Sequence, residues 1–133
     1  MFVVNPQELI ELAKKAMGRA YAPYSGFCVG AALLARSGEV YLGCNIENAS
    51  FSPTICAERT AFAKAVSEGE REFTAIAVVG GKEGDTDGLC PPCGVCRQVM
   101  QEFCGPEFLI HMEGKHGIET LTLAQLLPYG FSL

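Results

Sequence analysis

Apolar residues recur along this chain at two spacings, one typical of helices and the other typical of strands. The segment Asn5-Pro6-Gln7-Glu8 has the order of a helix start, with a capping Asn and a Pro at the first helical position. Apolar positions then repeat every three or four residues as far as Ala20, which predicts an amphipathic helix. The apolar runs 29–35 and 40–44 follow, separated by turn residues, and this arrangement predicts a β-hairpin.

The alternation continues in the second half of the chain. Its predicted elements are a helix over 56–67, a strand over 74–79, a helix over 93–104, a strand over 107–112 and a short helix over 121–127. The strand over 74–79 is apolar throughout, which favours a central position in the sheet. A chain of 133 residues suits one hydrophobic core, so we expect a single domain spanning 1–133. Alternating strands and helices indicate an α/β fold, arranged as a three-layer α/β/α sandwich.

Composition and charge argue against several functional classes. Hydrophobic residues make up 49% of the chain, enough to build a core, but no apolar run reaches the roughly 18 residues of a membrane span. The net charge is −5 and no basic run is present, which argues against nucleic acid as a partner. The chain has seven cysteines and lacks the charged, apolar start of a signal peptide. We therefore expect reduced thiols and a cytoplasmic protein with no membrane partner.

Three of the cysteines have the spacing of a catalytic zinc site. Cys56 is followed two residues later by a carboxylate, Glu58, and Pro92 precedes a Cys-x-x-Cys pair made of Cys93 and Cys96. Catalytic zinc sites keep three protein ligands and leave the fourth position open for water. A carboxylate beside the metal can carry protons between that water and a substrate. The pattern therefore predicts hydrolytic replacement of an aromatic amine by oxygen.

The same residues are predicted to lie at helix N-termini. Thr54 is a candidate cap for the helix over 56–67, and Pro92 suits the start of the helix over 93–104. Two helix N-termini would then face one metal, and their positive ends favour thiolates. Three thiolates on a divalent ion leave a formal charge of −1, so we expect Arg59 to donate a hydrogen bond to a ligand sulfur.

Other cysteine arrangements remain open from the sequence alone. Cys90 and Cys93 form a second Cys-x-x-Cys, so a closed four-sulfur site with Cys56 and Cys96 is an alternative, as is a structural zinc. The two prolines after Cys90 favour an extended segment that directs its thiol away from the other sulfurs. A closed site would also leave Glu58 without a function. We interpret the remaining cysteines as small buried packing residues, namely Cys28, Cys44 and Cys104.

Further segments of the chain extend the metal motif into a family pattern. They are Tyr24–Leu33, Asn45–Ser50, Cys56–Arg59, Pro92–Gln98 and a terminal Leu127-Pro128 with Phe131. Together they make the chain resemble the small cytidine deaminases of the all-cysteine, homotetrameric type. The resemblance implies a mixed sheet of about five strands flanked by helices, and hydrolytic deamination of cytidine and deoxycytidine to uridine and deoxyuridine in pyrimidine salvage. It also implies one Zn²⁺ per subunit, with proton transfer by Glu58 and the ligands Cys56, Cys93 and Cys96.

The same resemblance assigns residues to the substrate. It places Asn45 and Glu47 at the ribose 3′-hydroxyl and Phe27 against the base. Backbone groups near Ala57 and Cys56 would read the pyrimidine edge. In a homotetramer with shared active sites, neighbouring subunits would supply the remaining contacts, from Ala49, Phe51 and Phe131.

Two departures from the family pattern and two alternative functions accompany this assignment. Phe51 stands where the family commonly has Tyr, and the loop over 81–89 is longer than usual.

No Arg or Lys lies within 45–55 to hold a phosphate, and Glu47 is anionic, so we expect nucleosides to be preferred over nucleotides. The alternatives are a deaminase of a related aminopyrimidine nucleoside such as blasticidin S, and a zinc-stabilised binding module without turnover.

Overall fold

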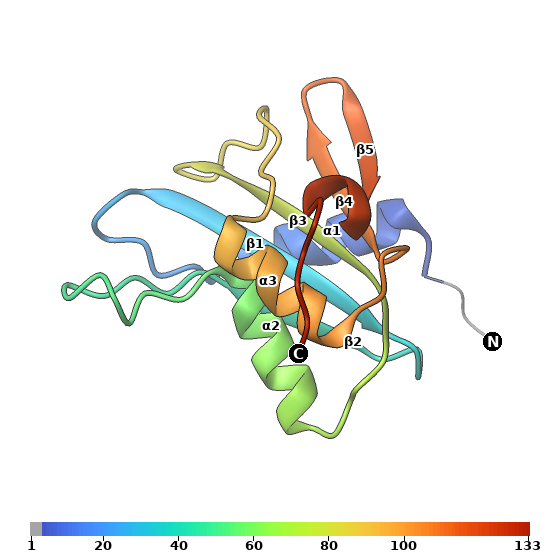
Figure 1. The fold of residues 1–133 in the computed structure, drawn as a ribbon. Coiled ribbons are helices and arrows are strands. Elements are labelled where there is room, and N and C mark those ends of the chain that lie inside the picture. Colours follow the sequence, from blue (N-terminus) through green and yellow to red (C-terminus); the bar gives the residue numbers. More distant parts are fainter. Residues whose placement is uncertain (1–3) are drawn as a thin grey trace.

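The computed structural model describes residues 4–133, which form a central sheet with helices on both faces (Figure 1). In chain order its elements are α1 (Pro6–Met17), β1 (Phe27–Ala35), β2 (Val40–Cys44), α2 (Ala57–Ser67), β3 (Phe73–Lys82), α3 (Gly94–Phe103), β4 (Leu109–Gly114), β5 (Gly117–Thr122) and α4 (Leu123–Leu126). The three-layer α/β fold predicted from the alternation of strands and helices is confirmed.

The strand order explains why two helices begin at the same end of the sheet. The order is β2-β1-β3-β4-β5, so β3 is central, as its apolar sequence predicts. β1 is antiparallel to both β2 and β3, which makes those two strands run in the same direction. Their C-terminal ends therefore lie at one end of the sheet, and α2 and α3, which follow them, both start there. β3 and β4 are parallel, a pairing that needs the crossover through α3, so the sheet is mixed.

The two faces of the sheet carry separate hydrophobic clusters. On one face α1 packs through Leu9, Ile10 and Ala13 against small strand residues. On the other face α2 and α3 pack through Phe62 and Met100. Figure 1 shows α1 behind the sheet and α2 and α3 in front of it. The start of α1 is fixed as predicted, because the Asn5 side chain accepts a hydrogen bond from the Glu8 amide at 2.8 Å.

The C-terminal prediction was partly wrong. Residues 121 and 122, predicted as helix, belong to β5, which the apolar pattern did not reveal as a strand. The reason is that β5 is an edge strand whose first four residues are exposed, so it carries no buried apolar alternation. The helix is confined to Leu123–Leu126, and Thr122 caps it in a reciprocal capping box with Gln125.

The packing cysteines are less buried than predicted. Cys28, Cys44 and Cys104 are all only partly covered, so the expectation of full burial was wrong. Cys44 sits at the end of the edge strand β2 and its Sγ lies 3.4 Å from the carbonyl oxygen of Arg19. Cys104 packs beside the cluster under α2 and α3, and burial raises the pKa of its thiol to about 12. These thiols therefore lie at the margins of the core.

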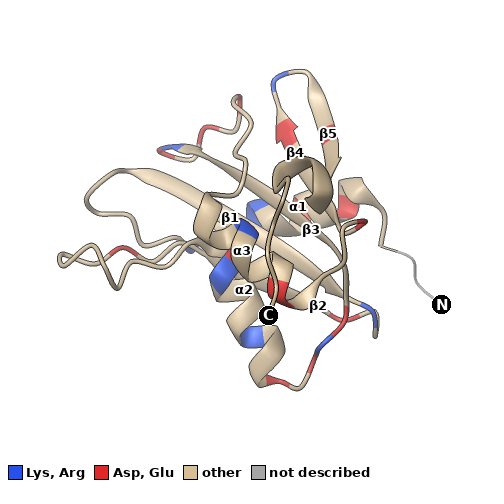
Figure 2. Cartoon of the chain, in the orientation of Figure 1, with Lys and Arg blue, Asp and Glu red and all other residues tan. Residues whose placement is uncertain are grey.

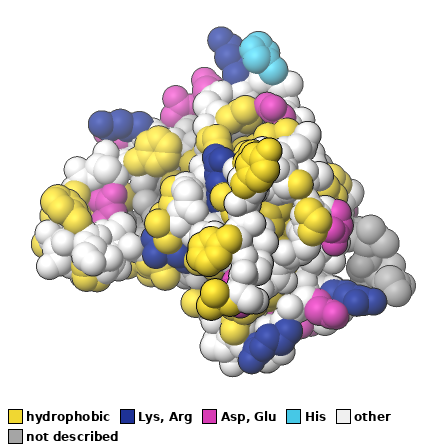
Figure 3. All heavy atoms as spheres, in the orientation of Figure 1, with side chains coloured by type: hydrophobic (Ala, Val, Ile, Leu, Met, Phe, Trp, Pro, Cys, Tyr) yellow, Lys and Arg dark blue, Asp and Glu magenta, His cyan; other side chains and the backbone are white. Residues whose placement is uncertain are grey.

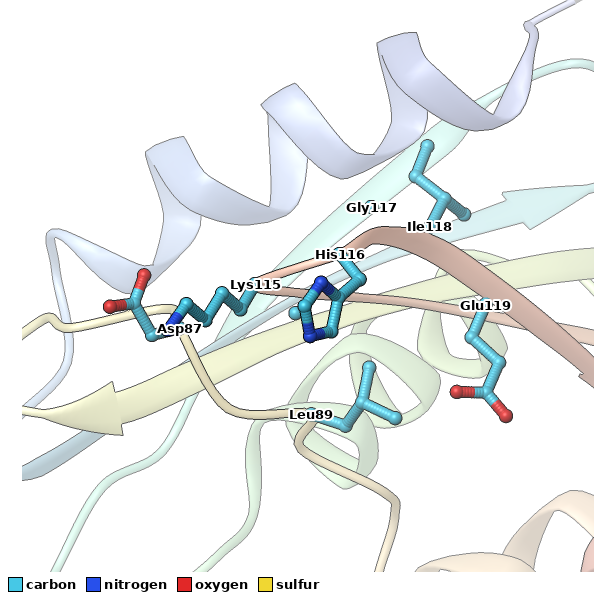
Figure 4. A pocket seen from close by; sticks show the side chains of 8 residues that line it. Asp87, Leu89, Lys115, His116, Gly117, Ile118 and Glu119 are labelled. Atoms are coloured by element: carbon cyan, nitrogen blue, oxygen red, sulfur yellow. The ribbon is translucent and has the colours of Figure 1, made fainter.

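The segment after β3 forms a surface loop against the β4–β5 hairpin. The Lys115 amide donates to the Asp87 carbonyl at 2.7 Å, which joins the loop to the hairpin. Figure 4 shows the hollow between them, with Asp87 and Leu89 on the loop and His116 and Glu119 on the hairpin. The hollow has a volume of about 510 Å³ and carries none of the residues assigned to metal or substrate.

Basic and acidic residues are interspersed along the described part of the chain. Figure 2 shows Lys and Arg spread over several elements, with acidic residues between them along the chain. Among residues 4–133 no helix has the length and apolar character needed to cross a membrane.

Gly43 lets α2 lie directly against β2. A Cβ atom added at Gly43 would meet the Ala57 carbonyl oxygen at 2.4 Å and the Ala61 amide nitrogen at 2.6 Å. Both contacts are with helix backbone, which cannot rotate away as a side chain can. Ala57 is the first residue of α2, so this close approach fixes the position of the helix start relative to the sheet.

We predict that Gly43→Ala lowers the free energy of unfolding by about 1–3 kcal/mol, because the added methyl overpacks a backbone contact. The measurement is chemical denaturation of the zinc-loaded protein. Gly88→Ala is the matched control, since a Cβ at Gly88 meets nothing within 4 Å and the residue has no positive φ. Equal stabilities of the two variants would contradict the close approach.

Candidate metal centre and substrate-binding residues

Two of the three predicted sulfur ligands occupy the N-cap positions of helices. Cys56 precedes α2 with extended dihedral angles of −75° and 155°, and Cys93 precedes α3 with −69° and 169°. Neither side chain caps its own helix, so both sulfurs are left available. Cys96 follows in the first turn of α3 and is buried. The predicted meeting of two helix N-termini at one point is therefore present.

The three sulfur atoms are close enough to hold one metal ion. Their Sγ atoms all lie within 4.8 Å of one another, with 3.8 Å between Cys56 and Cys93 and 3.5 Å between Cys93 and Cys96. Zinc–sulfur bonds of about 2.3 Å in a tetrahedron place sulfurs roughly 3.8 Å apart, so the cluster fits Zn²⁺. Cys90 is not a member of this cluster among the described residues, which disfavours the closed four-sulfur site.

Arg59 brings positive charge to the sulfurs. Its Nη2 donates to Cys56 Sγ at 3.5 Å, which is the predicted contact. Its Nε is buried and has no hydrogen-bond partner among the described residues, so donor capacity remains beside the cluster. Hydrogen bonds from Cys96, then from Arg59 and Cys93, lower the pKa of the Cys56 thiol to about 5. The donor set is therefore suited to a thiolate-bound cation.

Glu58 lies buried beside the sulfurs, at the second residue of α2. Burial raises the pKa of its carboxyl to about 7, and the charge of Cys56 adds to the rise. A carboxyl that titrates near neutral pH can both accept and return a proton. A backbone hydrogen bond, a hydrogen bond with Cys96 and the charge of Arg59 act to lower the pKa of Glu58, but they do not outweigh burial.

The approach to Cys56 differs from the predicted cap. Thr54 does not cap α2; its hydroxyl accepts from the Asn48 amide at 3.0 Å, and Cys56 itself is the N-cap residue. The chain is instead held by an isolated bridge in which Ile46 and Ile55 exchange two backbone hydrogen bonds of 3.0 Å. This bridge places the segment carrying Asn45 and Glu47 directly beside the segment that leads to the metal ligands.

Asn45 and Phe27 are joined through the backbone of β1. The side-chain Nδ2 of Asn45 donates to the Phe27 carbonyl, and its Oδ1 accepts from the Val29 backbone amide, both at 2.8 Å. Asn45 is 8% exposed, whereas Phe27 is 42% exposed at the first position of the strand. The Asn45 side chain therefore fixes the start of β1 and retains one N–H for a further acceptor.

Glu47 is held by the turn that precedes β1. Its Oε1 accepts from the Tyr24 amide at 2.9 Å and from the Ser25 amide at 3.1 Å, and its Oε2 accepts from the Ser25 hydroxyl. The hydrogen bond from Ser25 is the largest influence that lowers the pKa of Glu47, followed by those of the two amides. The carboxylate faces a hollow of about 460 Å³ that Phe51 and Thr54 also line.

The remaining predicted substrate residues lie at the periphery of this chain. Ala49 is exposed, Phe51 is 74% exposed with a φ of 61°, and both belong to the loop that projects at the left of Figure 1. Phe131 is 65% exposed, and its carbonyl accepts from the Gln98 side chain at 3.2 Å, which lays the C-terminal segment along α3. Ala57 is fully buried, so only its backbone is available to a ligand.

Sequence reasoning missed contacts that hold these elements together. Arg97 Nε donates to the Pro92 carbonyl at 2.7 Å and its Nη1 to the Leu126 carbonyl at 2.6 Å, which ties the segment before Cys93 to α4. Thr60 donates to the Cys44 and Cys56 carbonyls. Ser25 was also missed, although a hydroxyl beside Gly26 in a turn is a signal for such a contact.

Comparisons with known proteins agree with this geometry. The family model of the cytidine and deoxycytidylate deaminase zinc-binding region matches residues 4–112. The cytidine deaminase of Sporosarcina psychrophila is 55% identical over 132 residues, covering 97% of this chain and 93% of that protein. The crystal structure of cytidine deaminase from Burkholderia pseudomallei has a TM-score of 0.86 at 47% identity, covering 94% of this chain and 98% of that one. That of Mycobacterium tuberculosis has a TM-score of 0.83 at 40% identity, covering 98% and 100%.

We predict one zinc per chain in the wild-type protein and in Cys90→Ser, because Cys90 lies outside the sulfur cluster. Cys96→Ser removes a ligand and should lower the zinc content well below one per chain. The measurement is metal content by mass spectrometry after dialysis against a weak chelator. Loss of zinc in Cys90→Ser to the extent seen in Cys96→Ser would contradict the three-sulfur site.

Proposed function

Because the chain belongs to the cytidine and deoxycytidylate deaminase family, we propose that it deaminates cytidine and deoxycytidine hydrolytically to uridine and deoxyuridine. Water adds its oxygen to C4 of the pyrimidine, the C4–N bond breaks, and ammonia leaves. One observation carries the proposal: three sulfurs converge at the starts of α2 and α3 with a buried carboxyl, Glu58, beside them.

The protein contributes the metal ligands and the proton carrier. Cys56, Cys93 and Cys96 hold Zn²⁺, which when bound supplies the Lewis acidity that makes water nucleophilic near neutral pH. Glu58 takes a proton from the attacking water and delivers it to the ring nitrogen. It then takes the remaining proton of the hydroxyl group now bound to C4 and passes it to the amine as the C4–N bond breaks, which leaves a carbonyl at C4 and releases ammonia. Both transfers need a carboxyl whose pKa is near the working pH, and burial provides this.

Arg59 offsets the charge of the thiolates. Three thiolates and one Zn²⁺ sum to −1, which would weaken the attraction between the metal and an electron pair of water. The guanidinium contact with Cys56 withdraws part of that charge, as do the positive ends of α2 and α3.

The substrate residues are assigned from both contacts and family membership. Asn45 and Glu47 bind the ribose 3′-hydroxyl, Phe27 stacks on the base, and the backbone at Ala57 reads the pyrimidine edge. In support, Asn45 and Glu47 are both anchored to the segment that begins β1, where Phe27 is half-exposed. The 45–55 segment contains no Arg or Lys, so a 5′-phosphate would meet an anionic carboxylate without a cationic partner.

We further propose that four copies of the chain assemble and complete one another's sites. Ala49, Phe51 and Phe131 would reach a neighbouring subunit. Figure 3 shows hydrophobic side chains on the projecting loop and over α3 and the C-terminal segment. Strongly exposed apolar residues there include Phe51, Val95, Tyr129 and Phe131. Exposed aromatic groups of this kind are typical of subunit interfaces. Because its proposed substrates are pyrimidine nucleosides, we also propose that the protein acts in pyrimidine salvage in the cytoplasm.

We predict that cytidine and deoxycytidine release ammonia with a kcat/KM above those of dCMP, free cytosine and blasticidin S. The measurement is ammonia release over this panel. Glu58→Gln is the matched control: it should keep its zinc and lose about 10²–10⁴-fold in turnover, because only proton transfer is removed.

Four outcomes would contradict this proposal. Near-normal turnover of Glu58→Gln would show that Glu58 does not transfer the proton. Preference for dCMP over deoxycytidine contradicts the nucleoside assignment, and preference for blasticidin S points to the related aminopyrimidine activity. Absence of turnover in a zinc-loaded protein leaves a zinc-stabilised binding module.

We predict that removal of residues 130–133 raises KM and shifts the oligomer toward smaller species together, because Phe131 serves a neighbouring site. Sedimentation and steady-state kinetics measure the two effects. A chain lacking only Leu133 keeps Phe131 and should behave as wild type. An active monomer at micromolar concentration would contradict shared sites, and so would a truncation that changes neither quantity.

A further inference from the structure

The Ser25 hydroxyl joins the side chain of Glu47, which is assigned to the sugar, to the backbone of Phe27, whose ring is assigned to the base. It donates to Oε2 of Glu47, and it accepts a hydrogen bond from the Phe27 amide at 2.9 Å. One side chain thus contacts both the carboxylate that lines the hollow shared with Phe51 and Thr54 and the backbone of the first residue of β1. In the described residues no other side-chain hydroxyl makes a contact with Glu47.

We propose that Ser25 is a positioning residue for the substrate, which fixes the Glu47 carboxylate relative to Phe27. The inference rests on the proposed function, in which Glu47 binds the sugar 3′-hydroxyl and Phe27 stacks on the base. Ser25 touches no part of the substrate in this proposal: it acts through Glu47, and the Phe27 amide holds its hydroxyl in place.

The hydroxyl supplies an orientation that the backbone donors alone do not. The amides of Tyr24 and Ser25 both donate to Oε1, which leaves the carboxylate free to turn about that oxygen. The Ser25 hydroxyl holds the second oxygen, Oε2, and so sets the plane of the group. A carboxylate oxygen has about two acceptor sites, so Oε2 keeps one for a sugar hydroxyl, in a direction that Ser25 determines.

The turn that carries Ser25 is itself held firmly. Gly26 has a φ of 70°, a conformation that suits glycine, and its amide donates to the Ala22 carbonyl at 3.0 Å. The Gly26 carbonyl accepts from the Glu83 amide at 2.6 Å, at the end of β3. Ser25 therefore projects from a fixed backbone, and its hydroxyl can transmit that position to Glu47.

The test combines a variant with a change in the substrate. Ser25→Ala removes the hydroxyl and keeps both amide donors. We expect it to raise KM for cytidine roughly tenfold, a typical effect of losing a hydrogen bond to a charged group, with a smaller change in kcat. For 3′-deoxycytidine, which lacks the hydroxyl assigned to Glu47, the same variant should change KM by less than about twofold. Ser25→Thr keeps a hydroxyl and should restore most of the affinity for cytidine.

Ser37 provides a matched control. Its hydroxyl also donates to a carboxylate, Oε2 of Glu70 at 2.6 Å, and accepts from the amide two residues later, that of Glu39 at 3.4 Å. It lies in the turn between β1 and β2 and belongs to no part of the proposed site. Ser37→Ala should leave KM unchanged for both nucleosides, and it reports the effect of losing such a motif on stability alone.

Equal losses for cytidine and 3′-deoxycytidine in Ser25→Ala would overturn the proposal, because they indicate a general structural effect. An unchanged KM for cytidine would overturn it as well. If Ser25→Ala does not fold, Ser25→Thr and Ser25→Val, which have the same shape with and without a hydroxyl, give the same comparison. Calorimetric binding of uridine and 3′-deoxyuridine repeats the comparison without turnover. A wild-type protein that does not deaminate cytidine contradicts the proposed function alone, and the binding comparison then decides the role of Ser25.

Discussion

The convergence of three sulfur atoms at two helix N-termini is the constraint on which the rest of this structure depends. Cys56 and Cys93 are 37 residues apart in the chain, yet their sulfurs lie 3.8 Å apart. The sheet makes this possible, because β2 and β3 run in the same direction and the helices that follow them, α2 and α3, begin at the same end of the sheet. The close approach at Gly43 then fixes where α2 starts relative to the sheet.

The fold places positive charge next to the three sulfur atoms. The positive ends of two helices and the Arg59 guanidinium stabilise the thiolate form of the sulfurs, which suits binding of a cation. The same positive groups reduce the net negative charge of three thiolates around that cation. Glu58 is a neighbour of the same sulfurs but lies buried, which favours its neutral form and raises its pKa to about 7. One short segment at the start of α2 therefore combines a sulfur that favours the thiolate form, a buried carboxyl and a guanidinium, each with a protonation state set by its surroundings.

Local patterns in the sequence predicted the parts of this account that depend on local chemistry. Ligand spacing identified the sulfur cluster, and alternating apolar segments identified most of the sheet. Predictions failed where long-range contacts decide: Thr54 bonds Asn48 instead of capping α2, and the exposed edge strand β5 has no buried alternation. The contacts of Glu47 were also out of reach, because its partners lie 22 and 23 residues earlier and meet it only in the folded chain.

The central claim is that three sulfurs hold one zinc and leave its fourth coordination position for an oxygen or nitrogen ligand, such as water. X-ray absorption at the zinc edge of the purified protein tests this most directly, because it counts sulfur neighbours without requiring a substrate. The account predicts three sulfurs at about 2.3 Å and one oxygen or nitrogen at about 2.0 Å. Four sulfur neighbours would contradict it, since the site would then be closed and Glu58 would have no water to act upon.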